Sequence, residues 1–227
     1  MPPLPSEGST WNPSAVTEEA KHEVGQTTAP SEPRLGSEEE LRWRKSMLSE
    51  TAAMRGVLFN AVLEVARTQG GDSAVQRCLE ASGEKKFLDF FSYPACKYLD
   101  LLYTAARLQS RDLEDFEVAM RRLGQQAAEN FLGSTAGRTL LVLVQNNPHR
   151  LINSLPWAIQ VGVSGVEVSV TRTGPWSGIV TVKRDFSPRP FVEAGILATF
   201  EAARVKGVKG RSWPVGPNTN EYEISWQ

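Results

Sequence analysis

The sequence predicts one α+β domain, in which an α-helical N-terminal part packs on a small antiparallel sheet. Apolar residues recur at helical spacing from about residue 39 to residue 160. From about residue 165 to residue 227 the pattern becomes β-β-α-β-β, because alternating segments flank one helical segment. The last of these, Tyr222 to Trp226, alternates apolar and polar residues, as a strand with one buried face does. These three observations define the fold class.

The first residues have a different composition. Residues 1–36 contain six prolines among Ser, Thr, Glu and Gly, so they cannot bury enough apolar surface to offset their ordering entropy. We therefore expect a disordered acidic tail over residues 1–38 and a single domain over residues 39–227. Eight acidic and two basic side chains give the first 40 residues a charge of −6. Because the net charge of the whole chain is −1, the remaining residues carry a charge of +5. A solvated tail is the preferred interpretation, and a tail that masks the basic body is the alternative.

The helical part begins with three predicted helices. Ser37 caps the first, which ends near Leu48, and Glu40 completes a capping box. The second runs from about residue 54 to residue 69, where two glycines end it. The third starts at Asp72 or Ser73 and continues to about residue 82.

Three longer helices and a short one follow the aromatic connection 87–94. Pro94 suits the first turn of one helix. Asp112 or Asp115 opens the next, whose apolar stripe runs from Phe116 to Phe131. The helix of residues 134–146 is almost wholly apolar, which predicts a place at the centre of the core. Residues 148 and 156 are prolines and should bracket a short helix.

Four strands and one helix complete the predicted domain. Residues 166–171 and 179–184 form a hairpin around a Gly-Pro-Trp-Ser-Gly turn. A helix over about 187–205 follows. A third strand over 207–213 and the strand that ends at Trp226 close the sheet.

Composition narrows the class of protein. A hydrophobic content of 41% and a charged content of 22% are ordinary for a globular protein, with no secretory signal and no apolar run long enough to span a membrane. Cys78 and Cys96 are the two cysteines. One disulfide is compatible with them, but two reduced thiols are preferred and fit a cytoplasmic protein.

The sequence contains none of the common catalytic or metal-binding motifs. We therefore predict no catalytic, cofactor-binding or metal-ligating residue, and we expect that the protein is not an enzyme. His149 is the single histidine outside the tail, and its place at a helix start indicates a polar surface residue. The acidic residues 112, 114, 115 and 117 suit a helix N-terminus better than a catalytic pair. Cys78 sits at an apolar helix position, where a thiol is usually inert, although modification is an alternative.

A basic group near the C-terminus has two interpretations. Residues 204, 206, 209 and 211 are Arg or Lys, with Trp213 nearby. They could contact phosphate, but a nucleic-acid surface has a larger excess of charge and a docking motif. A solvated helix end and edge strand is preferred, so no nucleic-acid partner is predicted.

Five motifs resemble a domain family of unknown function that is heavily duplicated in myxobacteria. They are RGVLFN at 55–60, FLDFFSYP at 87–94, RRLG at 121–124, AGRTL at 136–140 and YEISW at 222–226. More remotely, the layout resembles the heme–nitric oxide/oxygen binding domains, the vinyl-reductase-type small-molecule binding domains and the subunits of the transport protein particle. This resemblance implies helices followed by a β-β-α-β-β part.

Two departures from the heme-binding relatives bear on function. The resemblance would place a proximal histidine near Thr139, where this chain has none. Those relatives also carry a Tyr-x-Ser-x-Arg motif on the first strands, whereas no tyrosine occurs here between Tyr103 and Tyr222. We therefore expect no heme and no other cofactor.

The first functional hypothesis is a non-enzymatic regulatory or protein-interaction module, with a protein partner or a second copy of the chain. The alternative is a sensor that binds an apolar small molecule or lipid between the helices and the sheet. Ordinary close packing of the same residues is the competing structural explanation. The candidate pocket residues lie on inward helical faces: Leu58, Val62, Leu102, Phe131 and Leu140.

Overall fold

The computed structural model describes residues 32–110, 113–145 and 147–227. The predicted disordered tail lies outside these ranges up to residue 31. Six helices form the N-terminal part: α1 (Glu38–Ser46), α2 (Gly56–Ser82), α3 (Ala95–Gln109), α4 (Leu113–Gly133), α5 (Thr135–Val144) and α6 (Pro148–Gly162). A seventh, α7 (Arg189–Ala202), lies among the later strands.

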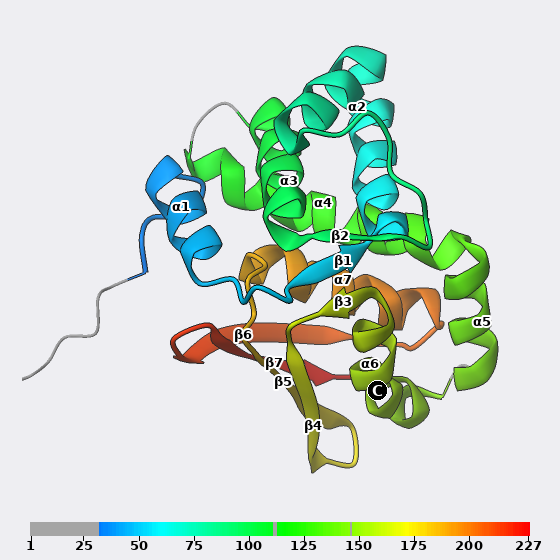
Figure 1. The fold of residues 1–227 in the computed structure, drawn as a ribbon. Helices are drawn as coiled ribbons and strands as arrows, with labels where there is room; N and C mark the ends of the chain where they lie inside the picture. Colours follow the sequence, from blue (N-terminus) through cyan, green and yellow to red (C-terminus); the bar gives the residue numbers. More distant parts are fainter. Residues whose placement is uncertain (1–31, 111–112, 146) are drawn as a thin grey trace, which may run out of the picture. The chain divides into compact units, whose positions relative to one another are not determined.

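Two antiparallel sheets accompany the helices (Figure 1). The larger has the order β4-β5-β7-β6, from β4 (Glu167–Gly174), β5 (Ser177–Lys183), β6 (Lys209–Gly216) and β7 (Thr219–Ser225). The sequence order β4-β5-α7-β6-β7 confirms the predicted β-β-α-β-β part, and the α+β class with it. The smaller sheet was not predicted. It has the order β2-β1-β3, from β1 (Ala53–Arg55), β2 (Ser92–Pro94) and β3 (Val163–Ser164).

The break predicted at the paired glycines is present, but inside one element. Gly71 has φ 67° and ψ −164°, so α2 kinks there and continues to Ser82. Glycine adopts this backbone conformation at little cost, since it has no Cβ. The prediction for Pro156 was wrong, because α6 runs through it to Gly162.

Helix α1 is held to the domain by a buried network of polar groups. The Ser37 hydroxyl accepts from the Glu40 backbone N–H at 3.0 Å, which confirms the predicted N-cap. The Glu40 carboxylate pairs with Arg44 at 2.5 Å and accepts from the Tyr103 hydroxyl at 2.7 Å. Arg44 also donates to a carboxylate oxygen of Glu32 at 2.7 Å. Part of the segment assigned to the tail thus contacts the domain.

Helix α5 lies at the periphery of the domain, so its predicted central position was wrong (Figure 1). Leu140 and Val144 are buried on one face. Val142 and Leu143 are exposed on the other, at 73% and 59%. The run from Leu140 to Val144 is apolar at every position, so it gives no indication of which face is covered, and periodicity could not predict this.

The buried residues form two clusters. One fills the space among α2, α3 and α4, and the other lies between the larger sheet and helices α5, α6 and α7. Helix α7 packs directly on α4, because Gly124 brings the two backbones together: a Cβ added there would lie 2.1 Å from the Phe191 carbonyl oxygen. In Figure 1, α2, α3 and α4 gather at one end and the larger sheet at the other.

Candidate functional site

A cavity of about 610 Å³ lies between the helices and the two sheets. Its wall combines residues from β1, α2, α4, α5, α6, β5 and α7 with the 185–187 loop. The sequence brings these elements together because each turns an apolar stripe or strand face inward. Large apolar side chains along the wall include Leu58, Phe131, Leu140, Leu155, Ile159, Val182 and Phe191.

The structure separates the five predicted pocket residues. Leu58, Phe131 and Leu140 line the cavity. Val62 and Leu102 do not, because they are fully buried in the cluster among α2, α3 and α4. From α3 only Tyr98 reaches the wall. An inward helical face therefore did not distinguish a cavity wall from a packed core, and a ligand role for the pocket stays a prediction.

Small residues account for much of the open space, and sequence reasoning missed them. Ala127 and Ala128 of α4 and Gly195 of α7 belong to the wall, and so do Ala158 and Gly162 of α6. These positions lack the side-chain volume that fills a core at ordinary density. No single segment reveals this, because the small residues come from elements far apart in the sequence.

One edge of the cavity is polar. The Asp185 carboxylate is buried and accepts hydrogen bonds from the Tyr222 hydroxyl at 2.6 Å and the Asn220 side chain at 3.0 Å. Burial raises the pKa of Asp185, and the lowering effect of these bonds only partly offsets it. Arg44 donates to the Ser187 carbonyl at 3.1 Å and so ties this edge to α1.

The residues that line the cavity do not fit a heme. Heme iron takes a His, Cys or Tyr ligand, or a Met together with a His. Within the described ranges no His or Cys lines the cavity, so Met54 has no such partner. Burial raises the pKa of Tyr98 well above its ordinary value, which disfavours the phenolate that binds iron. Thr139, at the position where the resemblance implied the ligand, is exposed on α5, and its hydroxyl donates to the Thr135 carbonyl at 2.9 Å.

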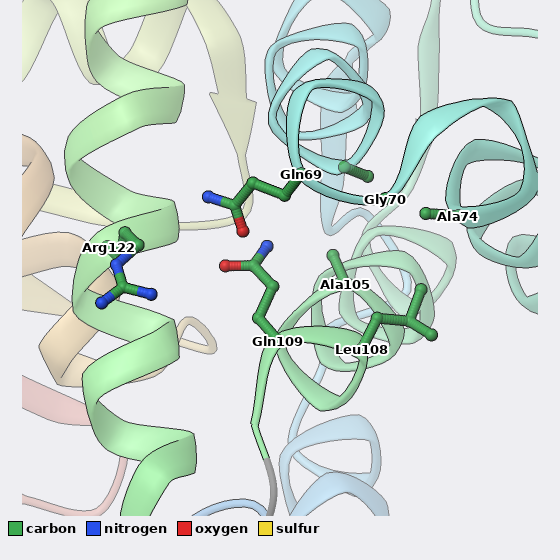
Figure 2. A pocket seen from close by; sticks show the side chains of 8 residues that line it. Gln69, Gly70, Ala74, Ala105, Leu108, Gln109 and Arg122 are labelled. Atoms are coloured by element: carbon green, nitrogen blue, oxygen red, sulfur yellow. The ribbon is translucent and has the colours of Figure 1, made fainter.

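A second, smaller pocket of about 160 Å³ lies between α2, α3 and α4 (Figure 2). Figure 2 shows Gln69 and Gln109 pointing toward one another, with Arg122 across from them. Both polar atoms of the Gln109 amide are buried without a hydrogen-bond partner in the described part of the chain. The space can hold several waters that would satisfy them. Among the described residues its lining includes no Ser, Cys, His, Asp or Glu.

Two other candidates from the sequence lie apart from the cavity. His149 is not the plain surface residue that was predicted, because its ring centroid lies 5.4 Å from that of Trp226 and 6.2 Å from that of Trp176. The Cys78 thiol is fully buried, and burial raises its pKa to about 11. A thiol with such a pKa is a poor nucleophile at neutral pH. Both cysteines are free.

Two of the charged residues singled out in the sequence form local ion pairs. Glu117 pairs with Arg121 at 3.1 Å, whereas residue 112 and the side chain of residue 114 lie outside the structural description. In the basic group, Arg211 pairs with Glu223, and its guanidinium lies 5.3 Å from the Trp213 ring centroid. None of the described members of either group lines the cavity.

The described residues lack two features that would bear on function. They contain no group of three or more His, Cys, Asp or Glu side chains placed to hold a metal ion. In the same ranges, no helix combines the length and apolar character that a membrane crossing requires.

The fold resembles that of H-NOX proteins. An Fe(II) unliganded H-NOX mutant from K. algicida superposes with a TM-score of 0.60 at 14% identity, covering 77% of this chain and 97% of that one. An H-NOX protein from S. oneidensis in the Fe(II)NO state gives 0.60 at 13% identity, with 77% and 99% covered. An oxygen-binding H-NOX domain related to soluble guanylate cyclases gives 0.60 at 10% identity, with 77% and 95% covered. Because the sequence identities are low, these superpositions show the fold alone. The fold is that of an H-NOX-like α+β domain.

The sequence also places the chain in a family. Residues 48–227 match the family described as a protein of unknown function, DUF2378, and the chain belongs to it. No curated protein matches the sequence significantly. Helix α1 precedes the matched residues.

Proposed function

We propose that this chain is a non-enzymatic regulatory domain that works without heme. The observation that carries the proposal is the wall of the cavity, where α5 presents Leu140 and leaves Thr139 exposed. An H-NOX-like fold with this wall keeps an internal space but offers iron no histidine. A regulatory role through a protein partner is compatible with the same geometry.

The buried acids support a role without catalysis. Glu40 and Asp185 are held by the hydrogen bonds described above. Glu193 accepts from Arg121 at 2.7 Å and from the Ser212 hydroxyl at 2.5 Å. A general acid or base must reach a substrate atom at hydrogen-bonding distance. These carboxylates are instead occupied in joining elements of the fold.

The cavity favours a second, more specific function, the binding of an apolar small molecule. Its volume of about 610 Å³ falls within the range of roughly 300–1,000 Å³ that is typical of small-molecule sites. Its wall is mostly apolar, and its charged groups are Arg55, Asp89 and Asp185 among the described residues. Such a space binds apolar molecules because water gains few hydrogen bonds inside it.

The test uses the full chain, a cavity-filling variant and the apolar fluorescent probe N-phenyl-1-naphthylamine. Ala158→Phe places a ring in the cavity, and Ala202→Phe adds the same ring at the exposed end of α7. We expect the wild type and Ala202→Phe to bind the probe equally. Ala158→Phe should bind about tenfold more weakly, which corresponds to about 1.4 kcal/mol.

Three measurements separate the possibilities. Equal probe binding by all three proteins would exclude the cavity as the site. Native mass spectrometry of protein purified from its own host should show either an apolar ligand or a protein partner, and each supports one form of the regulatory role. A ligated-heme absorption band after incubation with hemin would contradict the heme-free proposal.

A further inference from the structure

Exposed apolar side chains surround the mouth of the cavity. Among the lining residues, Phe90 and Val161 are exposed at 84% and 49%. Phe91 lies next to Phe90 in the chain and is 62% exposed. Trp157, one helical turn before Val161 on α6, is 56% exposed. Apolar surface of this kind around an opening marks a surface of interaction.

The exposure of the two phenylalanines is fixed by the backbone. The Gly56 N–H donates to the Phe91 carbonyl at 2.8 Å, and the Arg55 guanidinium donates to the Phe90 carbonyl at 2.6 Å. Arg55 also donates to the Val161 carbonyl at 3.3 Å. A Cβ at Gly56 would lie 2.1 Å from the Leu88 carbonyl oxygen, so only glycine allows this approach. The motifs 55–60 and 87–94 therefore interlock and hold both rings outward.

Two lysines precede the exposed phenylalanines by four to six residues in the chain. Lys85 and Lys86 lie near the start of the loop that follows α2, are exposed, and form no ion pair with any described residue. Asp89, an exposed acid among the described lining residues, accepts from the Asn60 amide at 2.7 Å. Residues 130–166, which include α5 and α6, contain no Asp or Glu.

We propose that this face docks on an anionic lipid bilayer. In this position the mouth of the cavity faces the acyl chains, and the apolar ligand enters from the lipid. The second step rests on the proposed ligand-binding function, whereas the docking does not. Aromatic side chains beside lysines are typical of surfaces that insert at a lipid interface. Lysine is depleted at protein–protein interfaces, which favours the lipid over a protein partner.

The test is sedimentation of the full chain with extruded vesicles. One set contains phosphatidylcholine, and the other mixes phosphatidylcholine with phosphatidylglycerol. We expect binding to the mixed vesicles, little binding to the neutral ones, and a loss of binding as salt increases. The double variant Phe90→Ser/Phe91→Ser should lower the partition coefficient by about tenfold or more. Lys85→Glu/Lys86→Glu should abolish the preference for anionic lipid.

The matched control is Val118→Ser, which removes an exposed apolar side chain on α4. It should bind vesicles as the wild type does, and urea unfolding should show that every variant is folded. Failure of the wild type to bind mixed vesicles, or equal binding by the phenylalanine variant, would overturn the docking. A dimer that the phenylalanine variant abolishes would assign the face to a second copy instead. Probe binding in the cavity without vesicle binding would leave the proposed function intact and refute only this inference.

Discussion

Replacement of Trp226 by Ala tests how the end of the chain closes the larger sheet. The side chain is 3% exposed, and its ring centroid lies 5.7 Å from that of Phe200. Strand β7 ends one residue earlier, at Ser225, whose backbone pairs with β5 and β6. Trp226 thus follows the last paired residue of β7, and its ring packs beside Phe200.

The magnitude follows from two opposing terms. Truncation of a buried Trp to Ala costs about 3–5 kcal/mol through lost burial and the cavity that remains. The indole N–H of Trp226 is buried without a partner among the described residues, a state that costs about 1–3 kcal/mol and disappears with the ring. The two terms together give an expected loss of about 2 kcal/mol, below the range for a buried Trp whose N–H is paired.

Two further variants separate the terms. Trp226→Phe keeps an aromatic ring and removes the unpaired N–H, so its free energy of unfolding should change by less than about 1 kcal/mol. Ser225→Ala, on the less buried face, should change it by no more than about 0.5 kcal/mol. Urea denaturation measures the free energy of unfolding of all three variants. The slope of this free energy against urea concentration should be the same for each, because a changed slope indicates a changed unfolded state. Equal effects at 225 and 226 would refute the assigned register.

Two other predictions concern buried polar groups. Tyr103→Phe removes a hydrogen bond to the buried Glu40 carboxylate, so it should lower the free energy of unfolding by about 1–3 kcal/mol, as urea denaturation would report. Tyr98→Phe is its control, because that hydroxyl has no partner in the described part of the chain, and a loss as large as that of Tyr103→Phe would contradict the assignment. Asp185→Asn tests the pH dependence. Burial raises the pKa of the Asp185 carboxyl in the folded state. The stability that arises from this raised pKa is therefore complete below the ordinary pKa of 3.8, and it is lost as the pH rises through the raised pKa. Urea denaturation over a pH series should therefore show that the free energy of unfolding of the Asn variant rises relative to that of the wild type as the pH rises. A difference that stays constant with pH would exclude this titration.

The sequence by itself determined the features that depend on neighbouring residues. Alternation in the last strand correctly predicted that Tyr222, Ile224 and Trp226 are buried. The Ser37 cap and the break at Gly71 were also readable, because a side-chain hydroxyl at a helix start and a residue without Cβ act within a few positions of the chain. The order β-β-α-β-β followed from the same local patterns.

Only the tertiary structure decided which surfaces meet. Strands β1, β2 and β3 have two or three residues each, too few for any periodicity, and they exist because their pairing partners are present. Leu58 and Val62 share a helical face, yet only Leu58 borders the cavity. The cavity arises from small residues on α4, α6 and α7 that become neighbours when these helices pack. Local sequence patterns indicate that a side chain points inward. The arrangement of the helices and strands determines whether that side chain packs against another side chain or borders an open space.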